Sequence, residues 1–184
     1  MKKLAIALAL TGSCVLATTV ASSPAFALET YEAKMEASDA ASQARVDMIN
    51  AFGDKTLKPG QYVWRDVPET AGPERFVISL SDQMGYFYRG YTLVGATTIS
   101  TGRADKPTPD GIFAVERKAA MYRSKKYDNA PMPFAQFFDP AGLALHAGYV
   151  ADNPNSHGCV HLPASFAKKL FSMTDVGMPI YIGA

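Results

Sequence analysis

Short runs of β-branched and aromatic residues dominate the chain from residue 75 onward. Such residues favour strands, and the Gly, Asp, Asn and Pro clusters between the runs favour turns. The expected strands are residues 75–80, 84–88, 91–101, 112–116, 143–147 and 178–182. The first three are separated by Ser81-Asp82-Gln83 and by Arg89-Gly90, which is hairpin-like spacing. The pattern predicts a mostly β domain with largely antiparallel strands.

Two stretches have helical composition. Residues 29–51 are rich in Ala, Glu, Met and Gln and contain no Gly or Pro, and Gly53 fits a helix end. Val46, Ile49 and Phe52 recur at a spacing of three on one face, but the first half has few large apolar residues. We therefore expect a helical arm that is partly detached from the rest. Pro163 suits the first turn of a second helix that runs to about Met173.

Residues 117–142 carry several aromatic residues and three prolines, Pro131, Pro133 and Pro140. We interpret this stretch as a long ordered loop. Loops of this length in a compact domain usually have a function. The expectation is a lid or a wall of a binding cleft.

The first 27 residues have the features of a secretory signal. Lys2 and Lys3 precede an apolar stretch, and Ala25-Phe26-Ala27 supplies a small-x-small cleavage site. Lipoprotein processing at Cys14 is a weaker alternative, because the apolar run before it is short. The expected division is a signal at 1–27, a helical arm and linker at 28–57, and a main domain at 58–184. The protein is expected to be exported, with no integral membrane segment after cleavage.

Charge and cysteine content narrow the possible functions. The chain has 18 basic and 17 acidic residues and a formal net charge of +1, so nothing indicates a nucleic-acid partner. Removing the leader also removes Cys14, which leaves Cys159 as the only cysteine. An exported protein with one cysteine has no internal disulfide, so this thiol is a candidate for reactivity.

The three histidines of the chain, His146, His157 and His161, all lie within sixteen residues of one another, together with Cys159. A thiol near imidazoles suits covalent acyl transfer, because a base must remove the thiol proton at neutral pH. Either His146 or His157 fits as that base. Gly158 lets the backbone approach a substrate, and the N–H groups around it and Cys159 are candidates for oxyanion stabilisation.

Other interpretations of the same window remain open. Ser156 fits a turn after Pro154-Asn155, and His161 fits an exposed or capping residue. Three histidines and a cysteine also have the ligand types of a zinc site, although His-x-Cys-x-His is not a common zinc spacing. We predict no metal and no cofactor.

Several strings together resemble the L,D-transpeptidase catalytic-domain family. The central one is Ser156-His157-Gly158-Cys159-Val160 with His146 upstream. The others are residues 77–83 (VISLSDQ), 100–102 (STG), 107–111 (PTPDG) and 127–133 (YDNAPMP). The resemblance extends over about residues 58–182. It implies a β-sandwich or barrel of antiparallel and mixed strands with one or two short helices.

The resemblance also implies a function. Cys159 would attack the third residue of a peptidoglycan stem peptide, release D-Ala, and pass the acyl group to the amine of a second stem in a 3→3 crosslink that supports cell-wall organisation and cell shape. His146 matches the base, and the carbonyl of Ala147 its orienting partner. Ser156, His157 and Gly158 match positions that shape the pocket and oxyanion site. The expected substrate-binding residues are Ser156, His161, Tyr149 and Ala147, and the expected location is the periplasm or cell wall.

Two departures from the family pattern bear on the substrate. The position two residues after the cysteine is usually Arg or Asn and here is His161, and the nine residues between His146 and Ser156 are fewer than in many members. Further expectations are acylation of the thiol by carbapenems and, as another acceptor, a wall-attached protein. The alternative functions are hydrolysis of the same acyl-enzyme, as in a carboxypeptidase or amidase, and a non-catalytic wall-binding module.

Overall fold

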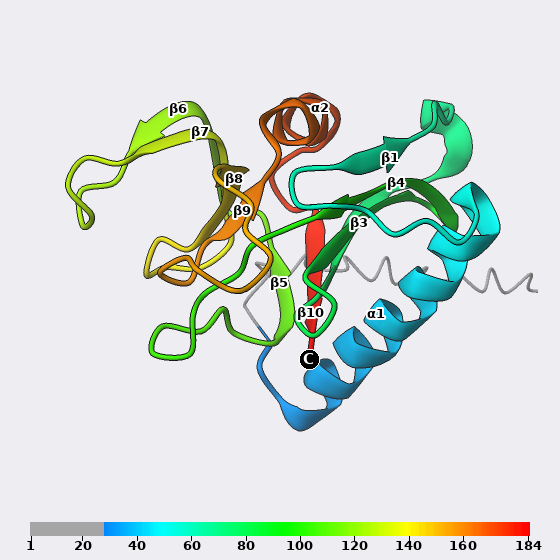
Figure 1. Ribbon diagram of the computed structural model, residues 1–184, viewed down its shortest axis with the longest axis horizontal. Helices are drawn as coiled ribbons and strands as arrows, with labels where there is room; N and C mark the ends of the chain where they lie inside the picture. The colour runs from blue at the N-terminus through cyan, green and yellow to red at the C-terminus, as the bar shows by residue number, and fades with distance from the viewer. Residues whose placement is uncertain (1–27) are drawn as a thin grey trace, which may run out of the picture.

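A computed structural model describes residues 28–184 of the chain (Figure 1). The expected leader, its cleavage site and Cys14 lie outside the described residues. Two sheets and two helices make up the described part, with one short 3-10 turn at Glu69–Ala71. The mostly β fold class predicted from the sequence is confirmed.

The larger sheet has six strands in the order β1-β4-β3-β2-β10-β5. Neighbours are antiparallel except β10 and β2, which run parallel. The expected strands at 75–80, 84–88, 91–101, 112–116 and 178–182 correspond to five of the six, and β1 was missed. Their bounds are β1 Tyr62–Trp64, β2 Glu74–Ser79, β3 Met84–Arg89, β4 Thr92–Thr98, β5 Gly111–Ala114 and β10 Pro179–Gly183.

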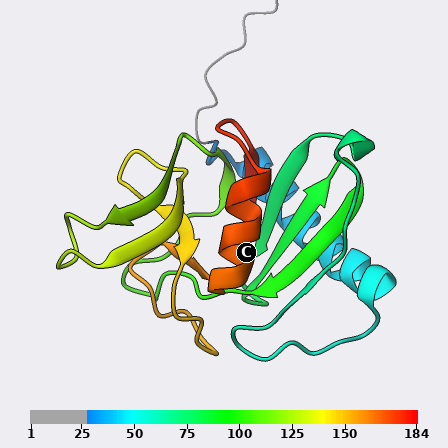
Figure 2. The ribbon, with the colours of Figure 1, turned by 90° about the horizontal axis from the view of Figure 1, so that it is seen from above.

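The smaller sheet has four strands in the order β6-β7-β8-β9, and its last pair, β8 and β9, is parallel. The strands are β6 Arg117–Arg123, β7 Pro131–Phe137, β8 Ala144–Ala147 and β9 Val160–Leu162. Helix α2, Ala164–Met173, lies between the two sheets, as Figure 2 shows from above. Its Phe166 and Leu170 share one buried core with Phe76 of the larger sheet and Leu145 of the smaller. One apolar core therefore joins both sheets.

The expected loop at 117–142 is instead a hairpin of β6 and β7. The prolines argued against strands because they cannot donate a ladder hydrogen bond. However, β7 pairs with β8 only at Gln136 and Phe137, so Pro131 and Pro133 lie where β7 has β6 as its single neighbour. The missing donors therefore cost little there. The hairpin projects away from the larger sheet in Figure 1.

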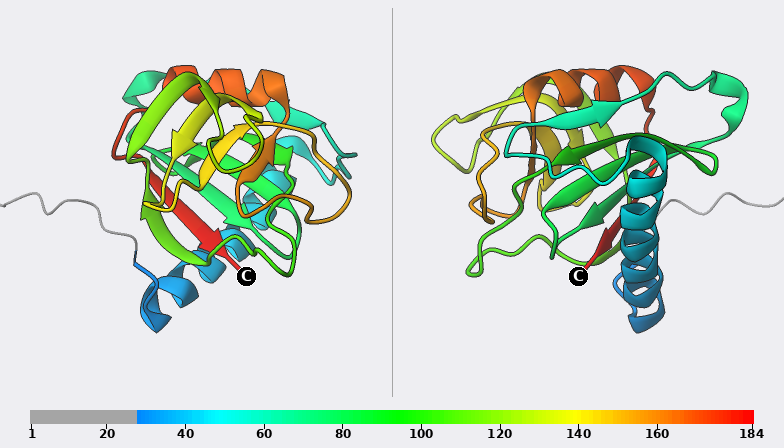
Figure 3. Two further views of the ribbon diagram at one scale, coloured as in Figure 1. Left: turned by 90° about the vertical axis from the view of Figure 1, so that its left-hand side faces the viewer. Right: turned by 45° about the vertical axis from the view of Figure 1, so that its right-hand side comes forward.

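Helix α1, Tyr31–Phe52, packs against the larger sheet and is not a detached arm (Figures 1 and 3). Its buried face consists of alanines and Met48, whereas Val46 and Ile49 of the expected stripe are exposed and only Phe52 packs partly against this core. Alanines let the helix backbone approach the sheet, whose tyrosines supply the bulk. The packing partners are Ala41, Ala44 and Met48 of α1 with Val77, Tyr86, Tyr88, Leu93 and Ala96 of the sheet.

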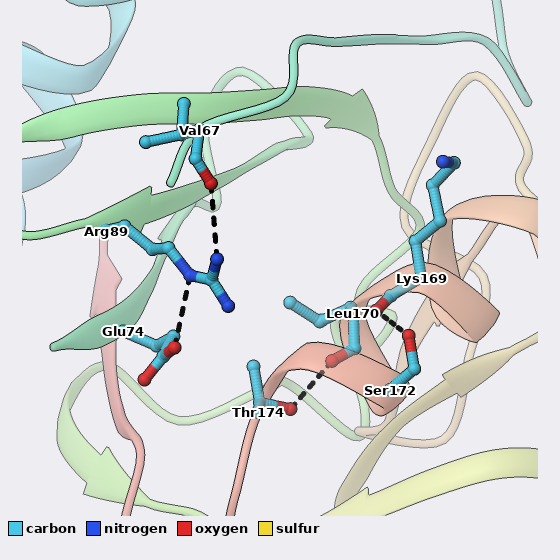
Figure 4. A network of polar contacts seen from close by, with 7 residues as sticks. All are labelled: Val67, Glu74, Arg89, Lys169, Leu170, Ser172 and Thr174. Atoms are coloured by element: carbon cyan, nitrogen blue, oxygen red, sulfur yellow. Dashed lines mark hydrogen bonds and ion pairs between the residues drawn. The ribbon is translucent and has the colours of Figure 1, made fainter. Parts of the chain in front are cut away.

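Polar contacts fix the ends of the elements around this core (Figure 4). The buried Arg89 pairs with Glu74 at 3.2 Å and also donates to the carbonyl of Val67. After α2, the Thr174 hydroxyl donates to the carbonyl of Leu170 at 2.8 Å. The contacts of Arg89 join β3 to β2 and to the segment before β2. The bond of Thr174 lies at the end of α2, the helix that contributes to the shared core.

Candidate active site

The parallel pairing of β8 with β9 brings together residues that are distant in sequence. Its register places His146 beside His161 and Leu145 beside Val160. Side chains alternate between the two faces of a strand, so Cys159, directly before β9, projects on the same face as His161 and therefore as His146. One face of this strand pair thus carries the thiol and two imidazoles.

His146 is held by a backbone hydrogen bond. The side chain is 6% exposed, and its Nδ1 lies 2.9 Å from the carbonyl oxygen of Ala147. A carbonyl only accepts, so Nδ1 is the donor and the neutral ring keeps its lone pair on Nε2. Gln136 has the only fully buried side-chain nitrogen or oxygen without a partner among residues 28–184, so Nε2 of His146 is not completely buried. The ring is therefore set up to accept a proton at Nε2.

Burial controls the protonation of this pair. It lowers the pKa of His146 to about 4, with the neighbouring His161 acting in the same direction and the bond to Ala147 opposing both. It also raises the pKa of the Cys159 thiol, against smaller opposing effects of the Ala144 backbone and the Lys126 ammonium. At neutral pH the site therefore holds a thiol and a neutral imidazole rather than a thiolate–imidazolium pair.

His157, the other candidate base, has a different environment. Its ring stacks on Tyr127 of the β6–β7 hairpin, with ring centroids 4.4 Å apart. The ring of His161 instead meets that of His146 edge to face at 4.8 Å, and its Nδ1 lies 3.0 Å from the carbonyl of Tyr149. Of the two candidates, His146 is thus the one that pairs with β9.

Ser156 and Gly158 form the loop that leads into the cysteine. The buried Ser156 hydroxyl accepts from the N–H of Gly158 at 3.1 Å and donates to the carbonyl of Cys159. Gly158 adopts φ +109°, and a Cβ there would lie 2.8 Å from a methyl carbon of Leu143, so glycine is required. The substrate contact expected of Ser156 stays a prediction; the residue is 2% exposed and its hydroxyl is bonded within the loop.

The same bonds revise the expected oxyanion donors. The N–H of Gly158 is already bonded to Ser156, whereas the N–H of Cys159 makes no hydrogen bond to any of residues 28–184. Sequence reasoning also missed Thr108, whose buried hydroxyl donates to the carbonyl of Gly158 at 2.9 Å and accepts from the N–H of Gly102. Its position between two prolines gave no sign of this contact.

A cavity of about 1130 Å³ opens over this face. One wall is the β6–β7 hairpin, which agrees with the expectation that residues 117–142 border a cleft. Tyr149 stands at its rim with 77% of its surface exposed. Tyr127, which the sequence reasoning did not single out as a site residue, also lines the cavity. The lining includes Tyr127, His146, Ala147, Tyr149, His157, Cys159 and His161.

The zinc alternative requires its ligands to converge. Within residues 28–184, no three His, Cys, Asp or Glu side chains form a group that is able to hold a metal ion. His157 lies against Tyr127 while His161 lies against His146. In the same described range, no helix is long and apolar enough to cross a membrane.

Comparisons with known proteins point to one family. The family model of the L,D-transpeptidase catalytic domain matches residues 73–182. Among solved structures, an L,D-transpeptidase from Stackebrandtia nassauensis is 24% identical with a TM-score of 0.57, over 76% of this chain and 66% of that one. L,D-transpeptidase 1 from Mycobacterium tuberculosis is 23% identical with a TM-score of 0.54, over 61% and 62%.

A third structure, a cysteine-to-serine variant of the Enterococcus faecium L,D-transpeptidase, is 25% identical with a TM-score of 0.53, over 60% of this chain and 49% of that one. This chain thus spans less than two thirds of the length of several solved relatives. No curated protein sequence matches it significantly.

Proposed function

We propose, from the premise that this chain belongs to the family of L,D-transpeptidase catalytic domains, that it is a cysteine acyltransferase acting on peptidoglycan stem peptides. The observation that carries the proposal is the placement of Cys159 and His146 on one face of the β8–β9 pair, under a large cavity. Because the match covers less than two thirds of the length of several solved relatives, the substrate and partners of the whole protein are part of the proposal.

In the first half-reaction, Nε2 of His146 takes the proton of the Cys159 thiol as the sulfur attacks the carbonyl of the third stem residue. The neutral thiol and the neutral imidazole suit this concerted transfer. The carbonyl oxygen becomes an oxyanion, for which the N–H of Cys159 is the free donor. The C–N bond then breaks, Nε2 returns its proton to the departing amine of D-Ala, and a thioester remains.

In the second half-reaction, the side-chain amine of another stem attacks the thioester and gives a proton to Nε2 of His146. The C–S bond breaks, the sulfur recovers the proton from the imidazole, and a 3→3 crosslink is the product. The bond from Nδ1 to the Ala147 carbonyl keeps the same tautomer available for both halves.

Hydrolysis is the second candidate, because water in place of the amine gives a carboxypeptidase or amidase with the same acyl-enzyme. His146 and Cys159 both line the large cavity, which has room for either nucleophile. We further propose that the protein is exported to the periplasm or cell wall after cleavage behind residue 27, and that a wall-attached protein is a second acceptor.

The function is tested by incubating the protein with purified disaccharide tetrapeptides and separating the products by mass spectrometry. Transfer gives dimers with one D-Ala lost, whereas hydrolysis gives only shortened monomers. Cys159→Ala is expected to abolish both while keeping the fold, because it removes one half-buried sulfur and breaks no disulfide. Unchanged muropeptides with the wild-type protein would contradict both functions.

A further inference from the structure

His161 lies in the wall of the cavity that Cys159 also lines. It lies beside His146 in the adjacent strand. It is two residues beyond Cys159 on the same face, which is roughly 7 Å along an extended chain. A peptide whose carbonyl reaches the sulfur of Cys159 therefore has a neighbouring group within reach of this ring.

The hydrogen bonding of the His161 ring is fixed by its surroundings. Nδ1 lies 3.0 Å from the carbonyl oxygen of Tyr149, and a carbonyl only accepts, so Nδ1 carries the hydrogen. A flipped ring would lose this bond. The ring also lies directly over Gly148, where an added Cβ would come within 2.7 Å of Cγ, and it meets the ring of His146 at 4.8 Å. These contacts hold the His161 ring in one orientation.

The remaining nitrogen, Nε2, has no partner in residues 28–184 and is not fully buried. In a neutral ring it presents a lone pair to the cavity. Burial lowers the pKa of His161, with the bond to Tyr149 opposing this effect and His157 adding to it, so the neutral ring is favoured at neutral pH. The ring therefore accepts hydrogen bonds there and donates none.

We propose that His161 is a specificity-determining residue, which accepts a hydrogen bond through Nε2 from an N–H group of the substrate and disfavours a carboxylate at that place. This inference rests on the proposed function and narrows its substrate class. Arg or Asn, which donate, occupy this position in the family pattern noted above. Here a carboxamide or an uncharged amine can donate a hydrogen bond to Nε2 of His161. A carboxylate has no hydrogen to donate, and its oxygen lone pairs would face the lone pair of Nε2.

Two synthetic stem tetrapeptides test the proposal. They are identical except that the diamino acid carries either a free carboxylate or a carboxamide beside its amine. The measured quantity is the ratio of their kcat/KM values for acylation at pH 7.5. The wild-type protein is expected to favour the carboxamide by about tenfold, the range that one neutral hydrogen bond supplies.

Three variants make the result specific. His161→Arg, which only donates, is expected to reverse the preference. His161→Asn, which both donates and accepts, is expected to bring the ratio close to one. Ala141→Arg is the matched control: Ala141 is exposed at the cavity rim, so the variant adds the same charge with the imidazole still in place, and the wild-type ratio should persist.

A wild-type preference for the carboxylate, or none, would overturn the inference. So would an Ala141→Arg ratio that shifts as far as that of His161→Arg, because long-range charge would then be the cause. If neither peptide acylates Cys159 in the intact-protein mass spectrum, the proposed function itself fails, and this inference fails with it. Acylation by both peptides at equal rates would contradict the role proposed for His161 and would leave the proposed function intact.

Discussion

At the scale of single residues, the site depends on backbone groups that hold side chains in one protonation state and orientation. The carbonyls of Ala147 and Tyr149 each fix the tautomer of one imidazole. The hydroxyls of Ser156 and Thr108 bind the peptide groups on either side of Gly158. Short-range hydrogen bonds to the backbone therefore hold the groups around Cys159 in place.

The lowered pKa of His146 has a consequence for pH dependence. A base with a pKa of about 4 stays neutral as the pH falls from 7.5 to 5.5, so the acylation rate constant of the free enzyme should change by less than about twofold. An unperturbed histidine, with a pKa near 6.5, would lose about tenfold over that range. Carbapenem acylation followed by absorbance measures the profile, and an acid midpoint near 6.5 would contradict it.

Thr108 should affect the rate of the reaction because it holds the loop that leads into Cys159. Thr108→Val removes the donor to the Gly158 carbonyl and the acceptor for Gly102, so both peptide groups lose a buried partner. We expect kcat to fall about tenfold or more, with a smaller change in KM. Thr108→Ser keeps the hydroxyl and should restore most of kcat. A serine variant as slow as the valine variant would contradict this role of the hydroxyl.

At the scale of elements, the strands were predictable and the contacts between elements were less so. Runs of β-branched and aromatic residues, such as 75–80 and 112–116, predict strands from the local sequence alone. The β6–β7 hairpin was not predictable, because its prolines are tolerated only through the short pairing of β7 with β8. The buried face of α1 was missed because alanine contributes little to an apolar periodicity, although it allows close packing.

The packing of α1 is tested by overfilling its contact with the sheet. Ala44 is completely buried against the larger sheet, so Ala44→Leu should lower the free energy of unfolding by about 1–3 kcal/mol. Val46→Leu is the control, because Val46 is 49% exposed on the opposite side, and a change below about 0.5 kcal/mol is expected. Urea denaturation measures both. Equal effects would mean that the alanine face is not the buried one.

The β6–β7 hairpin is expected to act through Tyr127. Its ring stacks on His157, and the Lys106 ammonium lies 5.2 Å from the ring centroid, so it joins the hairpin to two loops at the cavity. Stacking of this kind is worth about 0.5–1.5 kcal/mol, so Tyr127→Ala should raise KM by up to about tenfold. Tyr127→Phe keeps the ring and should behave as wild type. A KM in Tyr127→Ala equal to the wild-type value would contradict this role.

At the scale of the whole molecule, the sequence pointed to the candidate site because three histidines and one cysteine fall in a single window. The strings around them carried the resemblance to a family, and that resemblance gave the fold. What sequence could not separate was His146 from His157, because only the parallel β8–β9 register places one of them beside β9. The commitment of the Gly158 N–H to Ser156 likewise depends on the folded loop.

The central claim, that Cys159 is acylated with His146 as its base, is tested most directly by intact-protein mass spectrometry after mixing with a stem tetrapeptide. The wild-type protein should gain the mass of the acylating tripeptide group, and Cys159→Ala should gain nothing. His146→Gln should form the adduct at least about a hundredfold more slowly, the usual contribution of a general base, whereas His157→Gln should retain it within about tenfold. An adduct on Cys159→Ala, or wild-type speed in His146→Gln, would contradict the account.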